Sequence, residues 1–226
     1  MKKLRTIIRW VIWTIAGLYI TTIVLLHIPA VQGFLAQKVG DVAGNKLGTE
    51  VHVGRIDLGF INRFVLDDIL IYDQSHKKML SASRVGARVD IWHLLRTGEI
   101  NISSAQLFGL RAELYKTSKD AKPNFQFVLD SLASKDTTSH TPLHLSINSL
   151  VIRHGNIKYD CLDVPTTPNR LNLNHINVSD ISSYLILNKL NDTSVWADLR
   201  ALAFKEASGL EVKQLAFELK ANQQQA

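Results

Sequence analysis

VGRIDLGFINRFVLDDILIYD, residues Val53 to Asp73, is the stretch that decides the fold. Apolar and polar residues alternate along it, as in half-buried strands, and the alternation breaks once, between Phe60 and Arg63. We therefore expect two strands, Val51–Gly59 and Phe64–Tyr72, joined by a turn at Ile61-Asn62. A link this short favours antiparallel neighbours, so the sequence predicts a β-sheet.

The period of two continues through most of the 226 residues. Two short helices interrupt it, a single turn at Ile91–Gly98 and a helix at Asn124–Ser134 with Asn124 as its N-cap. The predicted class is mainly β, an N-terminal transmembrane helix followed by an elongated antiparallel sheet with short capping helices. The further strands are expected at Met79–Ile91, Ile100–Leu107, Leu110–Lys116, Leu143–Arg153, Asn156–Asp160, Leu171–Val178, Val195–Phe204 and Leu210–Lys220.

Residues 1–28 combine a basic tip with an apolar segment. Trp10–Ile28 has 19 residues without a formal charge, and a spanning helix needs about 20. Because the four preceding cations stay on the cytoplasmic side, we expect a single-pass anchor with a cytoplasmic N-terminus. A cleaved signal peptide is the alternative, but the run exceeds a usual signal core. The cations are Lys2, Lys3, Arg5 and Arg9, and the anchor residues singled out are Trp10, Trp13, Tyr19 and Ile28.

The charge balance of the chain follows from that segment. The net charge of +6 comes from 26 Lys and Arg against 20 Asp and Glu. Residues 1–28 hold four of the cations and no acid, which leaves 22 against 20 in the remainder. No basic stripe with interleaved aromatics is present, so no nucleic acid is expected as a partner. The single cysteine, Cys161, is expected to be a free thiol.

Residues 29–48 are expected to form an amphipathic helix. Pro29 suits its first turn and Gly48 its end. Two placements are open, on the membrane surface or as a cap on the start of the β structure, and the low number of cations favours the cap at least equally. The predicted apolar face comprises Val31, Phe34, Leu35, Lys38, Val39, Val42, Ala43 and Leu47.

A weak repeat links distant strands. Ile102–Leu107 matches Ile147–Ile152 at an offset of 45 residues, and the match extends to Leu114 against Tyr159. A third copy is Val212–Phe217. The shared pattern indicates an elongated sheet built from a recurring unit, with chance similarity between apolar strands as the alternative.

The histidines give no metal-site pattern. His140 and His144 straddle Pro142 at a loop and have no third ligand nearby, so we do not expect zinc. We expect five further histidines to be ordinary surface or loop residues, namely His52, His76, His93, His154 and His175.

Catalytic patterns are likewise missing from the sequence. Asp67 and Asp68 point to opposite faces of one strand and cannot form a pair unaided. Asp73 is expected to open a turn rather than to bind calcium. No glycine-rich phosphate loop is present, and no serine has a recognisable base beside it. We therefore expect no enzymatic activity, no cofactor and no metal.

Three motifs follow the anchor in a fixed order. They are V-x-V-G-x-I-x-L at Val51–Leu58, L-x-D-I-x-I-x-D at Leu66–Asp73 and L-L-x-x-G-x-I-x-I at Leu94–Ile102. Together with the helix NFQFVLDSLAS and the strand GLEVKQLAFELKAN, this order resembles the N-terminal region of the AsmA-like family, and within it the TamB-type branch. No catalytic residue is carried over.

The resemblance implies a long β-sheet curled into a groove, apolar inside and polar outside. It implies an inner-membrane protein with its bulk in the periplasm that carries phospholipid toward the outer membrane. For the TamB-type branch it also implies assembly of outer-membrane β-barrel proteins with a barrel partner. Because the sequence stops just after a strand, we expect residues 49–226 to be the first part of a longer groove region.

A lipid groove needs an apolar surface, because each CH₂ group of a lipid tail that is left in water raises the free energy by about 0.8 kcal/mol. Alternating strands place every second residue on one face. A closed sandwich core would show the same alternation, so both remain open at this stage. The groove candidates are Ile56, Leu58, Phe60, Ile69, Ile71, Ala105, Leu107, Leu150, Ile152, Leu215 and Phe217.

Three functions fit these expectations. A lipid conduit is favoured, with phospholipids and the inner membrane as partners. An assembly factor that pairs its strand edges with β-barrel clients is the alternative. A passive anchor or scaffold is the third.

Overall fold

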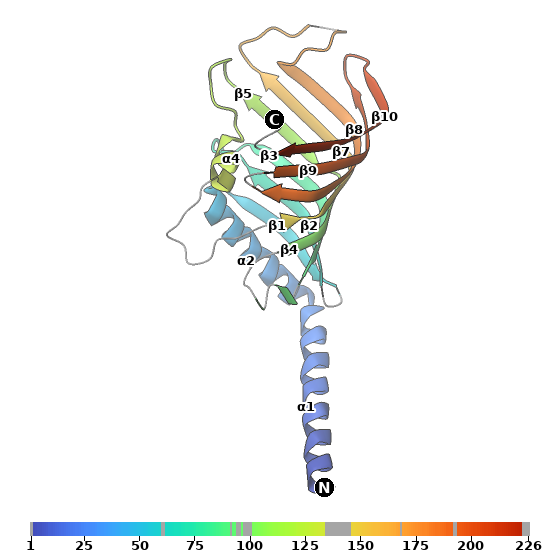
Figure 1. Ribbon diagram of the computed structural model, residues 1–226. Coiled ribbons are helices and arrows are strands. Elements are labelled where there is room, and N and C mark those ends of the chain that lie inside the picture. The colour runs from blue at the N-terminus through green and yellow to red at the C-terminus, as the bar shows by residue number, and fades with distance from the viewer. Residues whose placement is uncertain are drawn as a thin grey trace.

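The computed structural model describes residues 2–59, 62–90, 92–93, 96, 101–133, 146–167, 169–191 and 194–222. The protein is mainly β, with 51% of its residues in strands, one N-terminal apolar helix and a large curved sheet. Figure 1 shows the helix standing clear of the sheet. The predicted fold class is confirmed.

Two helices open the chain. α1, Lys2–Leu26, contains a segment from Thr6 to Leu26 that is long and apolar enough to cross a membrane and is not buried by other residues. α2, Pro29–Leu47, follows after a break at Ile28, whose extended backbone reflects the proline that comes next. Pro29 and Gly48 lie at the helix ends, as predicted, and Gly48 adopts a left-handed φ of 67°.

Ten strands form one sheet. Its order is β1-β2-β3-β4-β7-β8-β9-β10, while β5 pairs with β3 and β7, and β6 pairs with β4. The strands are β1 Val51–Leu58, β2 Arg63–Tyr72, β3 Lys78–Val89, β4 Asn101–Phe108, β5 Arg111–Lys116, β6 Ser146–Ile147, β7 Ser149–Cys161, β8 His175–Asn191, β9 Ser194–Glu206 and β10 Glu211–Asn222.

One part of the sheet is parallel, contrary to the prediction of purely antiparallel pairing. β7 runs parallel to β4 and β5. A parallel neighbour needs a long crossover, and that connection contains the helix α4, Gln126–Ala133. The partners across the pairs, such as Ala105 with Leu150 and Leu114 with Tyr159, differ by 45 residues. The first two copies of the sequence repeat are therefore neighbours in the sheet.

A line of left-handed residues crosses the sheet. Asp68, Gly109, His154 and Asp180 have φ between 55° and 62°, and we call this line the crease. The Gly109 amide donates to the Arg153 carbonyl, which places the β4–β5 junction beside His154. Asp, Asn and His tolerate this conformation better than most residues do, and glycine adopts it freely.

The crease resets the alternation of side chains. Val53 and Ile56, three residues apart, belong to one buried cluster against α2, and Leu66 and Ile69 pack on the same cluster. In an uninterrupted strand, residues three apart would face opposite sides. The reset keeps one face apolar on both sides of the crease. It also explains why the strand predicted from the sequence stops at Val178, whereas β8 continues past Asp180 to Asn191.

α2 caps the first strand, which is one of its two expected placements, but the face that it buries matches the predicted one only in part, with Leu35 packed on the core cluster. Its buried residues are Ala36, Gly40 and Gly44, whereas Phe34 and Val42 of the predicted face are 58% and 68% exposed. The reason is close approach. A Cβ atom built on Gly40 would lie 2.8 Å from the Val51 carbonyl oxygen, so only small residues fit against β1.

We expect Gly40→Ala to destabilise the protein by about 1–3 kcal/mol, because the new methyl group collides with backbone that cannot move cheaply. The measurement is chemical unfolding of the full chain in detergent. Gly33→Ala is the matched control in the same helix, since its Cβ would meet nothing within 4 Å. The control should be neutral or stabilising by up to about 1 kcal/mol. Equal effects of the two substitutions would contradict the packing argument.

Candidate lipid-binding face

Two rows of residues cross eight strands in register. Each row joins direct partners from β1 to β10, and fifteen of the sixteen residues are apolar, with Ser183 as the exception. The first row is Ile56, Leu66, Val85, Leu107, Ile152, Ser183, Leu202 and Leu215. The second row is Leu58, Phe64, Ala87, Ala105, Leu150, Leu185, Leu199 and Phe217. We call the surface that these rows define the apolar face.

Eight of the eleven predicted groove candidates lie in these rows. Ile69 and Ile71 belong to β2 on the other side of the crease, and Ile69 packs on the cluster that also holds Ile56. Phe60 lies outside the described residues. The candidates in the rows are Ile56, Leu107, Ile152 and Leu215 in the first, and Leu58, Ala105, Leu150 and Phe217 in the second.

Sequence reasoning missed the contribution of β8 and β9 to the apolar face. Leu185, Leu199 and Leu202 complete the rows between β7 and β10. Leu185 was overlooked because Asp180 interrupts the alternation of its strand. Leu199 and Leu202 lie within a strand that was predicted, but a register shift in β9 places them three residues apart on one face. The signal available in the sequence was the apolar run YLIL after Asp180.

The apolar face is covered at one side and open at the other. Beside α2, Val53 and Ile56 are each 6% exposed. In β10, by contrast, Leu215, Phe217 and Leu219 are 43%, 52% and 48% exposed. A closed sandwich core would bury these side chains, and no described residue covers them. Within the described part of the chain, the apolar face is therefore an open surface.

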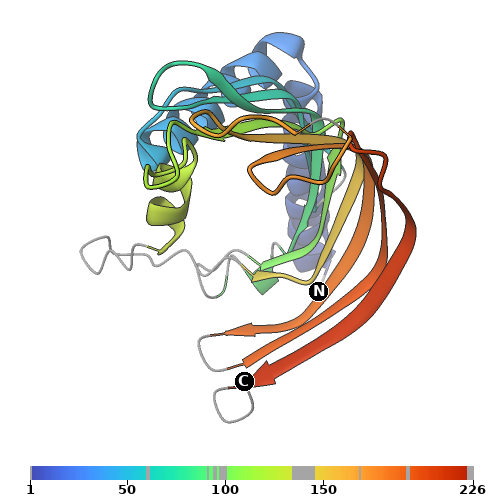
Figure 2. The ribbon, with the colours of Figure 1, turned by 90° about the horizontal axis from the view of Figure 1, so that it is seen from above.

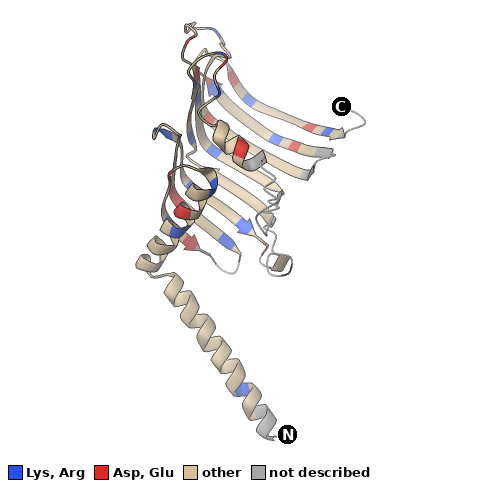
Figure 3. Ribbon diagram, turned by 90° about the vertical axis from the view of Figure 1, so that its left-hand side faces the viewer, with Lys and Arg blue, Asp and Glu red and all other residues tan. Residues whose placement is uncertain are grey.

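The sheet curls toward the side that carries the helices. Figure 2 shows its strands as an arc, and Figure 3, which views the molecule from the open side, shows α2 and α4 in front of the strands. α2 and α4 also contact each other. Since Ile56 and Leu66 pack against α2, the apolar face is the inner face of the curve.

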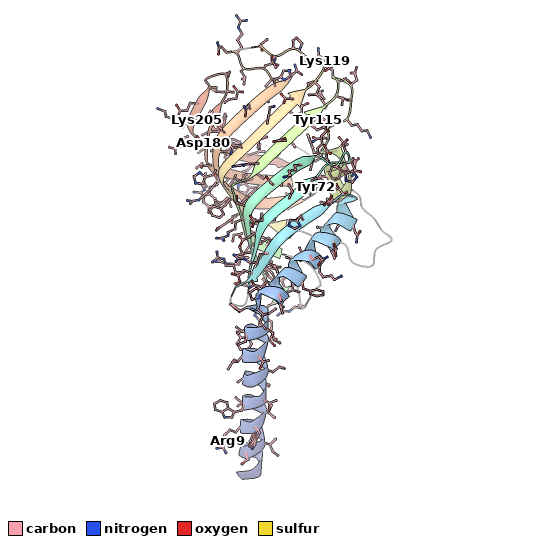
Figure 4. All side chains as sticks on the ribbon, turned by 180° about the vertical axis from the view of Figure 1, so that it is seen from behind. Arg9, Tyr72, Tyr115, Lys119, Asp180 and Lys205 are labelled. Carbon is pink, nitrogen blue, oxygen red and sulfur yellow. The ribbon has the colours of Figure 1, made fainter. Side chains whose placement is uncertain are left out.

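The outer face of the sheet carries charged residues. Asp67, only 7% exposed, accepts from Arg55 Nη2 and from Arg84 Nε at 2.7 Å each. The three residues are direct partners on β1, β2 and β3. The hydrogen bond from Arg84 is the main cause that holds the pKa of Asp67 below its usual value. On β8 and β9, Lys205 lies 3.5 Å from Asp180, as Figure 4 shows from behind. The outer face thus carries charged residues among apolar ones, such as Val151 and its partner Tyr184, whereas the two inner rows are apolar.

Asp73 closes the turn between β2 and β3, as predicted. Its carboxylate accepts from the Ser75 and Lys77 amides and from the Tyr115 hydroxyl. Asn124 does not cap α4 as expected. Its side chain accepts from the Tyr115 amide at 3.0 Å and donates to the Glu113 carbonyl at 3.1 Å, because β5 presents free backbone groups there. These contacts attach the start of α4 to the sheet.

His175 is not the ordinary surface histidine that we expected. Its Nδ1 lies 2.9 Å from an Asp160 carboxylate oxygen, and its Nε2 lies 2.7 Å from the Val164 carbonyl. Both partners are acceptors, and only the imidazolium can donate from both nitrogens. The Asp160 hydrogen bond, followed by that of Val164, raises the pKa of His175. Lys158 also contacts Asp160, at 2.9 Å.

Cys161 is the last residue of β7 and begins the connection to β8 that His175 ends. Its side chain is completely buried, and the thiol lies 2.9 Å from an Asp163 carboxylate oxygen, to which it donates. Burial raises the pKa of this thiol. The chain offers no second cysteine, so the thiol is free, as predicted, and its protonated form is unreactive.

No group of three or more His, Cys, Asp or Glu residues among those that the structure describes is arranged to hold a metal ion. His140 and His144 lie outside the described residues, as does most of the predicted turn at Ile91–Gly98. Only Trp92, His93 and Arg96 of that turn are described, and they have helical backbone.

Comparisons with known proteins identify no family for this chain. No protein-family model matches it, and no curated protein matches it either. The class of protein is therefore defined by the fold itself, a large curved β-sheet with an apolar inner face behind an N-terminal helix that can span a membrane.

We expect the turn after Cys161 to loosen as the pH rises. Because the folded-state pKa of His175 is raised, its stabilising contribution is complete below the ordinary histidine pKa and is lost as the pH rises through the folded-state value. Hydrogen exchange of the amides of residues 161–175 should therefore accelerate relative to that of the β2–β3 turn.

His175→Gln should abolish this pH dependence, since glutamine does not titrate. His52→Gln, at an exposed histidine of β1, is the control and should retain it. An unchanged pH profile in His175→Gln would show that another group causes the effect.

Proposed function

We propose that this chain is an inner-membrane-anchored periplasmic protein that carries phospholipid between the inner and outer membranes along its apolar face. The observation that supports this most is the continuity of the two rows across eight strands. A surface of this kind binds chains of CH₂ groups without the directional contacts that a catalytic site needs.

The magnitudes favour such a role. Two acyl tails expose roughly thirty CH₂ groups, so leaving them in water would cost about 25 kcal/mol at about 0.8 kcal/mol per group. Strands lie about 4.8 Å apart, so a row through eight strands extends roughly 34 Å. One leaflet of a bilayer has a hydrocarbon depth of about 15 Å. A lipid tail that lies along a row therefore has sufficient apolar surface.

The remaining features fit the proposal. α1 provides the inner-membrane anchor, with its N-terminus in the cytoplasm and the sheet in the periplasm. The charged outer face keeps the sheet soluble while its inner face holds lipid. The motif order that resembles the AsmA-like family points to the same role, and the proposal requires no cofactor and no enzymatic step.

Photocrosslinking with a photoreactive amino acid tests the proposal. Neighbouring residues on opposite faces give matched pairs, in which only the first member should capture radiolabelled phospholipid in cells. The pairs are Leu107 with Gln106, Ile152 with Arg153, and Phe217 with Glu218. Equal labelling of both members, or no labelling of a folded protein, would contradict a lipid-filled inner face.

A charge on the inner face should block lipid movement without unfolding the protein. Phe217→Asp is suitable because Phe217 is half exposed, so the substitution leaves no buried charge. We expect lipid crosslinking at Leu107 to remain, while transfer of lipid between the inner and outer membranes falls sharply. Ala216→Asp, next to it on the other face by alternation, should transfer lipid normally. Normal transfer by Phe217→Asp would oppose a path along these rows.

A second function, assembly of outer-membrane β-barrel proteins, is favoured by a different observation. α2 lies against the β1 backbone, whereas β10 ends the strand order and has one pairing edge unused by described residues. Such an edge can accept a strand of a client or of a barrel partner. Protein adducts from a photoreactive residue at Lys220, combined with no lipid adducts at Leu107 or Ile152, would favour this function over lipid transport.

A further inference from the structure

The end of the sheet nearest α1 can be located from packing and register. α2 and β1 run in opposite directions, because Gly40 lies against Val51 while Ala36, nearer the helix start, packs with Ile56. The end of β1 is therefore beside the start of α2. The Val89 amide donates to the Asn62 carbonyl, so β3 ends there too.

The end of β3 and the start of β4 consequently lie on the side of the sheet where α2 begins. Val89 is paired with Ile102 at the start of β4, so the two strand ends that flank Trp92 lie at the same end of the sheet. Trp92 lies in this connection and is 75% exposed. The neighbouring His93 amide donates to the Asp90 side chain at 3.0 Å, which fixes the start of the turn.

A tryptophan with this exposure is costly in water. Its ring is large and apolar, and its N–H group still needs a polar partner. The headgroup region of a bilayer satisfies both requirements, which is why tryptophan is enriched there. Trp92 follows the last residue of β3 by three positions, at the end of the sheet where α2 continues from α1, which places that region within its reach.

Phe34 on α2 shows the same combination of exposure and position. It is 58% exposed and follows Pro29 by five residues, about 7.5 Å along the helix axis. Figure 1 shows α2 inclined to α1, so Phe34 stands less than this above Pro29, which is comparable with the headgroup region, about 6 Å thick on each side of the bilayer. Lys38 lies over the Phe34 ring, with Nζ 5.8 Å from its centre, and an ammonium group can bind the lipid phosphates.

We infer that Trp92 and Phe34 seat this end of the sheet in the phospholipid headgroups of the membrane that α1 crosses. The inference depends on the proposed anchoring by α1, but not on lipid transport. This contact holds β1 to β4 against the bilayer surface, so that the apolar face begins where lipid is present. It also accounts for the exposure of Phe34, which does not pack on the sheet.

Tryptophan fluorescence tests this inference. The chain has four tryptophans, Trp10, Trp13, Trp92 and Trp196, so replacing three at a time with phenylalanine gives single-tryptophan proteins. Each full-length protein is placed in phosphatidylglycerol–phosphatidylethanolamine vesicles that contain phospholipid brominated near the headgroup end of its tails. The bromine atoms quench only tryptophans that reach the bilayer.

The Trp13 protein reports on insertion of α1, and the Trp196 protein serves as the soluble control. Trp196 lies on β9 opposite Lys220, near the end of β10, and Figure 3 shows that end far from α1. We expect Trp92 to lose emission in brominated vesicles, as Trp13 does, while Trp196 keeps its emission.

Two results would overturn the inference. Quenching of Trp13 without quenching of Trp92 would leave the anchor in place but exclude the headgroup contact. No quenching of Trp13 would refute the anchor and the contact together, and the photocrosslinking pairs would still test lipid binding separately. If Phe34→Ser reduces the quenching of Trp92 while Val42→Ser does not, the two aromatic residues act as one contact.

Discussion

The strict alternation of side chains along a strand is the constraint on which the architecture depends. A surface that stays apolar over a curved sheet requires every strand to keep the same set of residues inward, and a one-residue slip would turn that set outward. The crease changes the phase of several strands at the same place. Left-handed backbone costs roughly 1–2 kcal/mol at a non-glycine residue. Asp68, His154 and Asp180 all adopt it, and we expect the continuous apolar inner surface to offset this cost.

The two edges of the sheet are treated differently. At β1, small residues of α2 bring a helix so close to the strand that its edge is covered, which prevents uncontrolled pairing. At β10, the edge and the side chains of Leu215, Phe217 and Leu219 are accessible within the described residues. This asymmetry gives the sheet a direction, from the side that α2 covers to an open side at β10.

Much of the fold followed from local patterns, because alternation and turn signals are written into neighbouring residues. The strands β1 and β2 and half of the sixteen residues in the inward rows were predicted for that reason. The 45-residue offset even anticipated a pairing, although the parallel direction was not predicted. The failures share a cause, dependence on distant partners. The buried face of α2 depends on the β1 backbone, Asn124 is held by β5, and His175 bonds to Asp160 and Val164.

The parallel register between β4–β5 and β7 has a consequence for how such a sheet changes in length. Ala105 faces Leu150 and Ala112 faces Ile157 at one constant separation. β4, β5 and the crossover that follows them therefore form a module with a fixed residue count, after which the next parallel strand begins. Duplicating or deleting the whole module preserves the inward set, whereas inserting a single residue inverts it. The number of strands in such a sheet can therefore change by whole modules through gene duplication or deletion, and the inner surface stays apolar.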